Sequence, residues 1–440
     1  MKKVLILGAG MVVKPIVHYL LDNNIEVTLA SRTKEKAEKA FEGYSNAKAV
    51  AWTIDQLDVL DELVKSHDLT VSLLPYTYHV AVAEICIANN KNMITTSYVS
   101  PEMNKLDKKA KDAGVIILNE LGVDPGYDHM TAMEIIDRVH DAGGKIDEFY
   151  SLCGALCAPE ASNNPFRYKF SWSPKGVVMA SNNDAQFLKN GEVVNVDTIN
   201  LFKDPLIIEF PEVEQMQVYP NRDSLPYVDI YGIPEVKTMY RGTFRYKNWC
   251  DALDLLKALN LTNYDERDLS GRTFAQVTAE LNGLNANRIK EDIKAKFNIN
   301  DNHVGLKAIE WLGVLDCKAV HLEKGSAFDL TSDLMIEKMM MDDSERDMVI
   351  MQHIFNVTRI DGKKEKIISR MLDYGDAEYT SIARTVALPA AIGAKMILDG
   401  EIKDTGVHIP IKKSIYTPIL DELKNLGISM TETVEKSITV

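Results

Sequence analysis

The stretch VLILGAGMVVKP, residues 4–15, decides the fold of the first part of the chain. Val4–Leu7 is a short apolar run, which predicts a buried strand. Gly8 and Gly10 follow at once, and from Met11 the apolar residues recur at helical spacing up to Asp22. The stretch therefore predicts a strand, a tight turn and a helix, which is the repeating unit of a parallel α/β sheet.

The same alternation continues to about residue 125. Apolar runs predict further strands, separated by helical patterns such as Lys34–Phe41, at Val27–Ala30, Leu69–Leu74, Met93–Thr96 and Val115–Leu118. Strands that alternate with helices pair in parallel, with right-handed crossovers and helices on both faces. The predicted fold class is therefore α/β, with a doubly wound parallel sheet at the N-terminal end.

The pattern changes near Gly126. Strand candidates separated by turns, which favour a mixed sheet, follow at Lys145–Cys153, Val193–Val196, Leu206–Glu209 and Thr238–Tyr246. Helical patterns dominate from Trp249 to about Met341, and we expect helix starts at Ser270 and Asn300. Further helices are expected at 377–395 and 419–426, and no internal repeat interrupts the chain.

The turn after the first strand has the chemistry of a phosphate site. Gly8 and Gly10 allow a tight turn and close approach of the backbone, and the helix that follows points its positive end at the turn. Val13 stands where the strict G-x-G-x-x-G pattern has its third glycine, and Pro15 completes a GxGxxxxP variant. The pattern favours a dinucleotide pyrophosphate over a turn without a ligand.

The end of the second strand indicates which dinucleotide binds. An NAD-selective domain typically has an acidic residue there, which holds the ribose 2′-hydroxyl. This chain has Ser31, Arg32 and Thr33 instead. A guanidinium and two hydroxyl groups suit a 2′-phosphate, so we predict NADP(H) rather than NAD(H).

Composition excludes several other classes of protein. The 440 residues carry 50 Lys and Arg against 64 Asp and Glu, a net charge of −14, and no basic cluster offsets it. Nucleic-acid binding is therefore not expected. We expect no signal peptide, because Gly8, Gly10, Lys14 and Pro15 interrupt the apolar run near the N-terminus, and no membrane span, because no long uncharged apolar stretch occurs. The five cysteines are few, odd in number and scattered, so we expect a cytoplasmic location and no metal site.

Five further segments carry a resemblance to one family. They are SLLPYTYH (72–79), TTSYVSPEM (95–103), NELGVDPGYDHM (119–130), APEASNNPFRYKFSWSPKGV (158–177) and GTFRYKNW (242–249). With these segments, and with GVHIP at 406–410, the chain resembles the NADP-dependent, L-glutamate-forming saccharopine dehydrogenases along essentially its whole length. The segment CGALCAP departs from the family pattern, since Ala155 and Cys157 replace Gly and Pro.

The resemblance implies an oxidoreductase that acts on a CH–NH bond. It would interconvert saccharopine, NADP⁺ and water with L-glutamate, 2-aminoadipate 6-semialdehyde and NADPH, in lysine metabolism. It implies a Rossmann-like domain of residues 1–125 with about 392–440, a mixed-sheet α/β domain for substrate binding and dimerisation of residues 126–248 with about 342–391, and a small helical domain of residues 249–341. A homodimer is expected, and the physiological direction stays open.

Matching motifs also imply site residues. Cofactor-binding residues would be Gly8, Gly10, Met11, Val12, Val13, Ser31, Arg32, Thr33, Leu74, Val123, Asp124, Pro125 and Ser173. Substrate-binding residues would be Ser97, Tyr98, Asp124, Arg222, Thr243, Phe244 and Arg245. Asp124 would orient the substrate amine, and the identity of the general acid or base stays open.

The residues themselves support part of this assignment. A substrate with three carboxylates needs fixed cations, and Arg222 lies in a turn-like segment, YPNRDS. Arg241 and Arg245, four apart in a predicted strand, would share a face. For each arginine alone, a salt-bridged or solvated role is as good an explanation. The match to the family favours carboxylate binding by Arg222 and Arg245.

Ser97, Tyr98 and Asp124 each follow a predicted parallel strand, where ligands of such sheets bind. Their alternatives are a helix cap for Ser97, a core or lid role for Tyr98 and a turn for Asp124. Ser100 is better explained as a helix cap. Two other functions stay open: a carboxynorspermidine-type dehydrogenase, and a non-catalytic NADP-binding sensor on the same scaffold.

Overall fold

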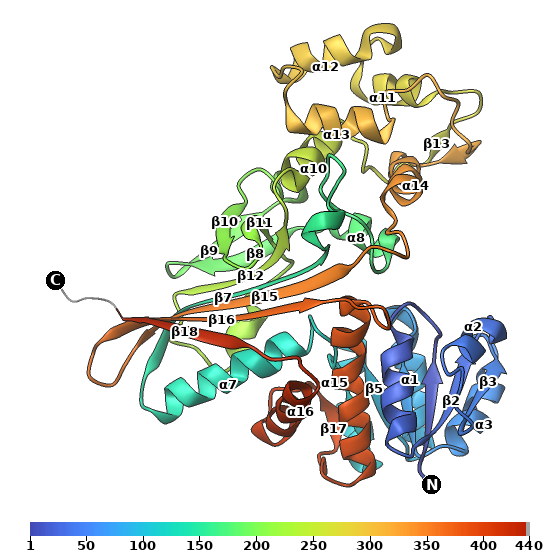
Figure 1. Ribbon diagram of the computed structural model, residues 1–440, viewed down its shortest axis with the longest axis vertical. Coiled ribbons are helices and arrows are strands. Elements are labelled where there is room, and N and C mark those ends of the chain that lie inside the picture. The colour runs from blue at the N-terminus through green and yellow to red at the C-terminus, as the bar shows by residue number, and fades with distance from the viewer. Residues whose placement is uncertain (437–440) are drawn as a thin grey trace. The chain divides into compact units, whose positions relative to one another are not determined.

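The computed structural model describes residues 1–436 and divides the chain into two compact units (Figure 1). The first unit contains Met1–Lys145, Thr358–Glu365 and the chain from Ser369 onward. The second contains Ile146–Val357 and Lys366–Ile368. The chain thus leaves the first unit after Lys145 and, for three residues, again after Glu365, and it returns to the first unit each time.

The first unit is built on a seven-stranded sheet with the order β17-β6-β5-β4-β1-β2-β3, in which every pair is parallel. Its strands are β1 (Lys3–Leu7), β2 (Glu26–Ser31), β3 (Ala47–Ala51), β4 (Leu69–Ser72), β5 (Asn92–Thr95), β6 (Ile116–Leu118) and β17 (Gly406–His408). The order changes direction at β1, so the carboxyl end of β1 is the switch point at which ligands of doubly wound sheets bind. The predicted doubly wound sheet is confirmed.

The helices of this unit lie between and after these strands in the chain. They are α1 (Val13–Asp22), α2 (Lys34–Lys39), α3 (Leu57–Lys65), α4 (His79–Ala88), α5 (Pro101–Asn104), α6 (Asp107–Asp112), α7 (Tyr127–Asp141), α15 (Ser381–Leu398) and α16 (Lys413–Asn425). Figure 1 shows α15 beside α1, and the two helices pack together. Among the described residues, only α15 is long and apolar enough to cross a membrane, but 78% of it is buried, as in a core helix.

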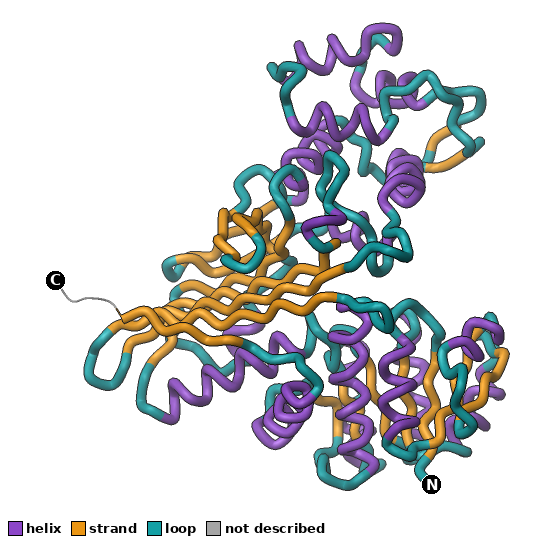
Figure 2. The backbone as a smooth tube through the Cα atoms, viewed as in Figure 1, coloured by secondary structure: helices purple, strands orange, loops and turns teal. Residues whose placement is uncertain are grey.

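The second unit has a mixed sheet, whose long strands are drawn in orange in Figure 2. Its strands are β7 (Lys145–Cys157), β8 (Ala185–Lys189), β9 (Glu192–Val196), β10 (Leu206–Phe210), β11 (Glu214–Pro220), β12 (Thr238–Arg245) and β15 (Asp347–Thr358). The order is β10-β11-β12-β7-β15; β12 pairs in parallel with β7 and antiparallel with β11 and β8. The rest of the sheet is β16 (Lys364–Tyr374), which follows β15, and β18 (Thr431–Lys436), which follows β16.

Short helices complete the second unit. They are α8 (Pro174–Ala180), α9 (Pro226–Ile230), α10 (Trp249–Ala258), α11 (Phe274–Asn282), α12 (Ile289–Phe297), α13 (Val304–Leu312) and α14 (Ala327–Met339), with a small ladder of β13 (Arg267–Asp268) and β14 (Lys324–Gly325). The helical character predicted for 249–341 and the α/β class with a mixed sheet are confirmed. The three-domain boundaries stay a prediction.

Two predicted helix starts are wrong. The helix expected to start at Ser270 begins at Phe274, because Thr273 and Gln276 form a capping box, whereas the Ser270 hydroxyl donates to Glu323 O. The helix expected to start at Asn300 begins at Val304. The Asn300 side chain instead accepts a hydrogen bond from the Asn302 amide, 2.9 Å away, which forms a local turn.

Candidate active site

The turn after β1 is shaped for close approach of a ligand to the backbone. Gly8 has φ +104°, and a Cβ there would lie 3.1 Å from Leu73 O, so the position requires glycine. A Cβ at Gly10 would meet no protein atom within 4 Å. Gly8 is therefore fixed by the fold, whereas Gly10 faces open space.

The helix after this turn presents an uncapped N-terminus. No side chain caps α1 at Val12, its first turn has no acidic residue, and Met11 is 55% exposed. The positive end of a ten-residue helix without a side-chain cap favours an anion, although the Val13 amide itself donates to Gly10 O at 3.3 Å. The turn and helix thus fit the pyrophosphate of a dinucleotide.

The predicted 2′-phosphate residues lie at the end of β2. Ser31 is half-buried and its carbonyl accepts from the Trp52 amide at 3.0 Å, while Arg32 and Thr33 are exposed. Thr33 is the N-cap residue of α2, but its hydroxyl makes no cap hydrogen bond. The polar groups of Arg32 and Thr33 are thus exposed at the carboxyl edge of the sheet, with half-buried Leu74 after β4.

The loops after β5 and β6 are tied together by side chains. Tyr98 donates from its hydroxyl to Asp124 Oδ1 at 2.8 Å. The Val99 amide donates to Glu120 Oε1 at 2.9 Å, and Glu120 Oε2 lies 2.8 Å from His129 Nε2. The structure therefore brings two predicted substrate residues, Tyr98 and Asp124, into direct contact. Asp124 is half-buried, between buried Val123 and Pro125.

Ser97 belongs to a cluster around a buried histidine. His79 Nδ1 lies 2.9 Å from Ser72 Oγ, and its Nε2 lies 2.8 Å from Ser97 Oγ and 3.0 Å from Thr95 Oγ1. Burial lowers the pKa of His79 to about 4, so the ring is neutral at physiological pH. We call His79 with Ser72, Thr95 and Ser97 the histidine cluster. Ser97 is not a helix cap; Ser100, three residues later, caps α5, and its hydroxyl accepts from Met103 N at 3.1 Å.

In the second unit, Arg245 is a buried cation surrounded by aromatic rings. It is 4% exposed, and its Cζ lies 4.9 Å from the ring centre of Tyr168, 5.7 Å from that of Tyr219 and 5.2 Å from that of Trp249. Its Nη1 donates to Phe244 O at 2.8 Å, whereas its Nε has no hydrogen-bond partner. No carboxylate within residues 1–436 forms an ion pair with it. We call Arg245 and these three rings the arginine cage.

The other predicted residues of the second unit differ in exposure. Arg222 is exposed in a turn with φ 53°, as the sequence predicts, and Thr243 is half-buried. The Phe244 ring is fully buried against Phe210, so only its main chain could meet a ligand. Ser173 caps α8 by accepting from Gly176 N at 3.3 Å.

Sequence reasoning missed the partners of these residues. Tyr168 and Trp249 stand in the family-like segments, but the sequence pattern indicates no role for them or for Glu120. Only Trp249 could have been found from the sequence, because it stands four residues after the predicted substrate residue Arg245. Among the described residues, no group of three or more His, Cys, Asp or Glu side chains is placed to hold a metal ion.

Two family models match the chain. The saccharopine dehydrogenase NADP binding domain matches residues 4–118, and the saccharopine dehydrogenase C-terminal domain matches residues 122–428. Together the two models cover both units.

Curated relatives and a solved structure are similar over nearly the whole chain. The saccharopine dehydrogenase [NADP(+), L-glutamate-forming] of Pyricularia oryzae is 38% identical, over 98% of this chain and 99% of that protein. The mitochondrial alpha-aminoadipic semialdehyde synthase of Bos taurus is 39% identical over 98% of this chain but only 47% of that protein, so the chain spans about half of its length. The structure of apo histidine-tagged saccharopine dehydrogenase (L-Glu forming) from Saccharomyces cerevisiae matches 99% of this chain and 100% of that one, with a TM-score of 0.91 and 35% identity.

A more distant relative bears on the alternative function. The carboxyaminopropylagmatine dehydrogenase of Synechocystis is 20% identical over 99% of this chain and 98% of that protein. The similarity to enzymes of this second type is thus much weaker.

Proposed function

This chain belongs to the saccharopine dehydrogenase family, and we propose on that premise that it is the NADP-dependent, L-glutamate-forming enzyme of lysine metabolism. It would interconvert saccharopine, NADP⁺ and water with L-glutamate, 2-aminoadipate 6-semialdehyde, NADPH and a proton. The observation that carries the proposal is the 38% identity to an enzyme of this activity along the whole of both chains.

The cofactor is NADP(H), and the turn after β1 fits it. We assign the pyrophosphate to Gly8, Gly10 and the main chain of Met11 to Val13, because the α1 N-terminus is uncapped there. Ser31, Arg32 and Thr33 would hold the 2′-phosphate. Further contacts are assigned to Leu74, Val123, Asp124, Pro125 and Ser173. Bound NADP⁺ or NADPH supplies the hydride chemistry.

The substrate carboxylates are assigned to the arginines of the second unit. Arg245 supports this because it is a buried cation without an acidic partner, and such a charge is destabilising until an anion meets it. Arg222, exposed in its turn, would bind a second carboxylate, with Thr243 and the main chain of Phe244 beside Arg245. Arginine suits this role because its planar group binds a carboxylate through two hydrogen bonds.

The substrate amine is assigned to Asp124. Hydride transfer between saccharopine and the cofactor passes through a cationic iminium, whose charge a fixed carboxylate stabilises. Tyr98 fixes Asp124 Oδ1 by a 2.8 Å hydrogen bond, and the histidine cluster fixes Ser97. Asp124 is therefore the orienting anion, and Tyr98 and Ser97 would contact the amino-acid part of the substrate.

The alternative is a dehydrogenase of the carboxynorspermidine or carboxyaminopropylagmatine type. Such substrates carry more amines and fewer carboxylates, so their site needs anions rather than arginines. The buried, unpaired Arg245 and the 20% identity both disfavour this alternative. A non-catalytic NADP sensor would bind cofactor without turnover.

The experiment is a spectrophotometric assay of NADPH formation. With NADP⁺, the protein should oxidise saccharopine and should not oxidise lysine, carboxynorspermidine or carboxyaminopropylagmatine. Turnover of a polyamine derivative without turnover of saccharopine would favour the alternative dehydrogenase. NADPH binding without any turnover would favour the sensor.

A homodimer and a cytoplasmic location belong to the same proposal. The family resemblance supports the first, and the five free cysteines fit a reducing compartment, which supports the second. Sedimentation velocity would test the dimer, and fractionation of the source cells would test the location.

A further inference from the structure

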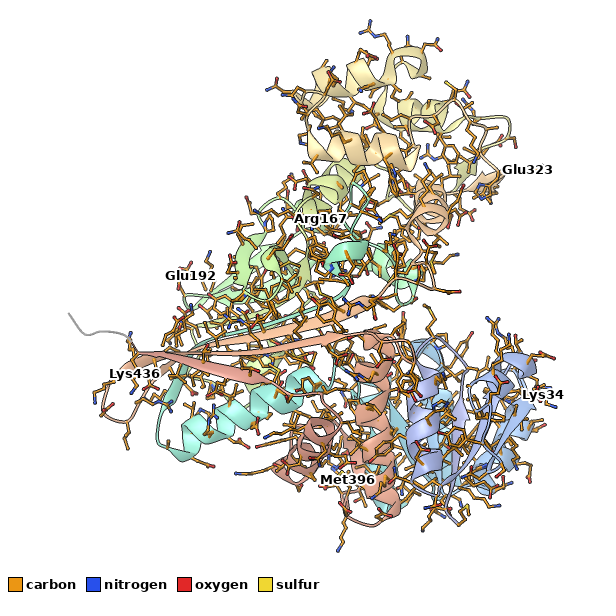
Figure 3. The ribbon with its side chains drawn as sticks, in the orientation of Figure 1. Lys34, Arg167, Glu192, Glu323, Met396 and Lys436 are labelled. Carbon is orange, nitrogen blue, oxygen red and sulfur yellow. The ribbon has the colours of Figure 1, made fainter. Side chains whose placement is uncertain are left out.

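The three lysines of α2 have different surroundings. Lys34, labelled in Figure 3, lies 3.4 Å from Glu38 in an i,i+4 ion pair. Lys36 and Lys39 form no ion pair with any residue from 1 to 436. In α2, therefore, the ammonium group of Lys34 has an acidic partner, whereas those of Lys36 and Lys39 have none among the described residues.

Lys36 and Lys39 line an open hollow beside the glycine turn. The hollow has a volume of about 380 Å³, and one side of it is formed by Ala9, Gly10, Met11 and Val13. Lys36, Lys39 and Ala40 of the α2 region form the other side, with Lys14 of α1 also in the lining. No acidic side chain lines the hollow, although the chain as a whole has a charge of −14.

The position of this hollow fits one part of the cofactor. In a doubly wound sheet, the pyrophosphate lies on the turn after β1 and the adenosine ribose near the end of β2. The hollow lies between that turn and the helix that follows β2. A 2′-phosphate on the ribose is a dianion, which two point-like ammonium groups would attract from the α2 side.

We infer that Lys36 and Lys39 bind the 2′-phosphate of NADP(H) and add to the selectivity assigned to Ser31, Arg32 and Thr33. The inference deepens the proposed function, because it names further residues for the same cofactor. Arg32 is exposed, and one exposed ion pair contributes little. Two more cations around the same phosphate would provide the discrimination that a single arginine does not.

The test measures binding, not turnover. Lys36→Gln, Lys39→Gln, the double variant and the control Lys34→Gln are titrated with NADPH and NADH by fluorescence. The same variants are titrated with 2′,5′-ADP and 5′-AMP by calorimetry. Each single variant should bind NADPH and 2′,5′-ADP roughly fivefold more weakly, which is the upper range for an exposed ion pair. The double variant should lose about 25-fold if the two effects add.

Binding of NADH and 5′-AMP should change less than twofold, and Lys34→Gln should leave all four ligands unaffected. The losses should shrink as salt rises, because exposed charges are screened. Equal losses of NADPH and NADH, an equal loss in Lys34→Gln, or no loss in the double variant would each overturn the inference. A wild-type protein that does not prefer NADPH to NADH would instead contradict the cofactor assignment itself.

Discussion

The histidine cluster of the first unit and the arginine cage of the second unit both bury a basic side chain. His79 is 3% exposed and Arg245 is 4% exposed. Burial lowers the pKa of His79 to about 4, so the imidazole sheds its charge and hydroxyl groups satisfy both nitrogens. A guanidinium stays charged in proteins, and the Nε of Arg245 has no partner.

The two residues differ in whether the protein itself provides their hydrogen-bond partners. It does so for His79, whereas Arg245 keeps an unpartnered Nε that suits a bound anion. His79 has contacts to three hydroxyl groups, which explain its burial without any ligand. Arg245 has aromatic faces and one carbonyl, which stabilise a cation but do not neutralise it. A charge of this kind is retained where function needs it, because an apolar residue would be as stable or more so.

The largest effect should come from a substitution of Asp124, the carboxylate assigned to the substrate amine. If the histidine cluster is neutral, Asp124 must supply the charge that stabilises the iminium. Asp124→Asn keeps the shape and removes that charge, so kcat/KM for saccharopine should fall by about 10²- to 10³-fold. Stopped assays at several substrate concentrations measure it, and the NADPH Kd from fluorescence serves as control. Near-normal turnover of the folded variant would leave Asp124 a turn residue.

The second effect tests the arginine cage directly. Arg245→Met should raise the KM for the amino-acid substrate by roughly 10- to 150-fold, because a charged hydrogen bond contributes about 1.5–3 kcal/mol. The same change should preserve or raise Tm, since it removes an unpaired buried charge. Arg222→Ala, at an exposed position, should raise KM less and leave Tm unchanged.

A structural Arg245 would give the reverse pattern. Arg245→Met would then lower Tm with little effect on the KM of the folded fraction. Arg245→Lys keeps a charge without the planar fork, so partial rescue of KM by lysine would identify carboxylate binding. Differential scanning fluorimetry beside the kinetics separates the two explanations.

The amino-acid sequence predicts the cofactor turn better than it predicts the arginine cage. Gly8 and Gly10 predict the cofactor turn, because a tight turn between a strand and a helix depends only on neighbouring residues. The arginine cage draws Tyr168, Tyr219 and Trp249 from separate segments, and no local pattern brings them together. Arg245 itself was predicted, from the family-like segment and from its place in a strand. The helix starts predicted at Ser270 and Asn300 are wrong, because the Ser270 hydroxyl donates to the distant Glu323 O and the Asn300 side chain forms a local turn.

The histidine cluster gives a pH effect of intermediate size. The unfolded state binds a proton on His79 below about pH 6.5, whereas the folded state does so only near pH 4. Unfolding is therefore favoured as pH falls through this window. At pH 5.5 the proton that only the unfolded state binds at His79 should lower the unfolding free energy by roughly 1 kcal/mol. Urea titrations at pH 7.5 and 5.5 measure it in the wild type and in His79→Gln, which should lack this component. Equal pH dependence in both proteins would contradict a neutral, buried His79.

The smallest effect should come from Ser97, where the histidine cluster reaches the predicted substrate residues. Its hydroxyl lies 2.8 Å from His79 Nε2, so the ring fixes its position and leaves it able to form a further hydrogen bond. A neutral hydrogen bond contributes about 0.5–1.5 kcal/mol, so Ser97→Ala should lower kcat/KM for saccharopine by roughly three- to tenfold. Ser72→Ala is the matched control, because Ser72 contacts the opposite nitrogen of the same ring and is fully buried. If Ser97 binds substrate, Ser97→Ala should change kcat/KM while Ser72→Ala changes stability alone. Equal loss of stability in both variants with unchanged kcat/KM would show that Ser97 only completes the contacts of His79.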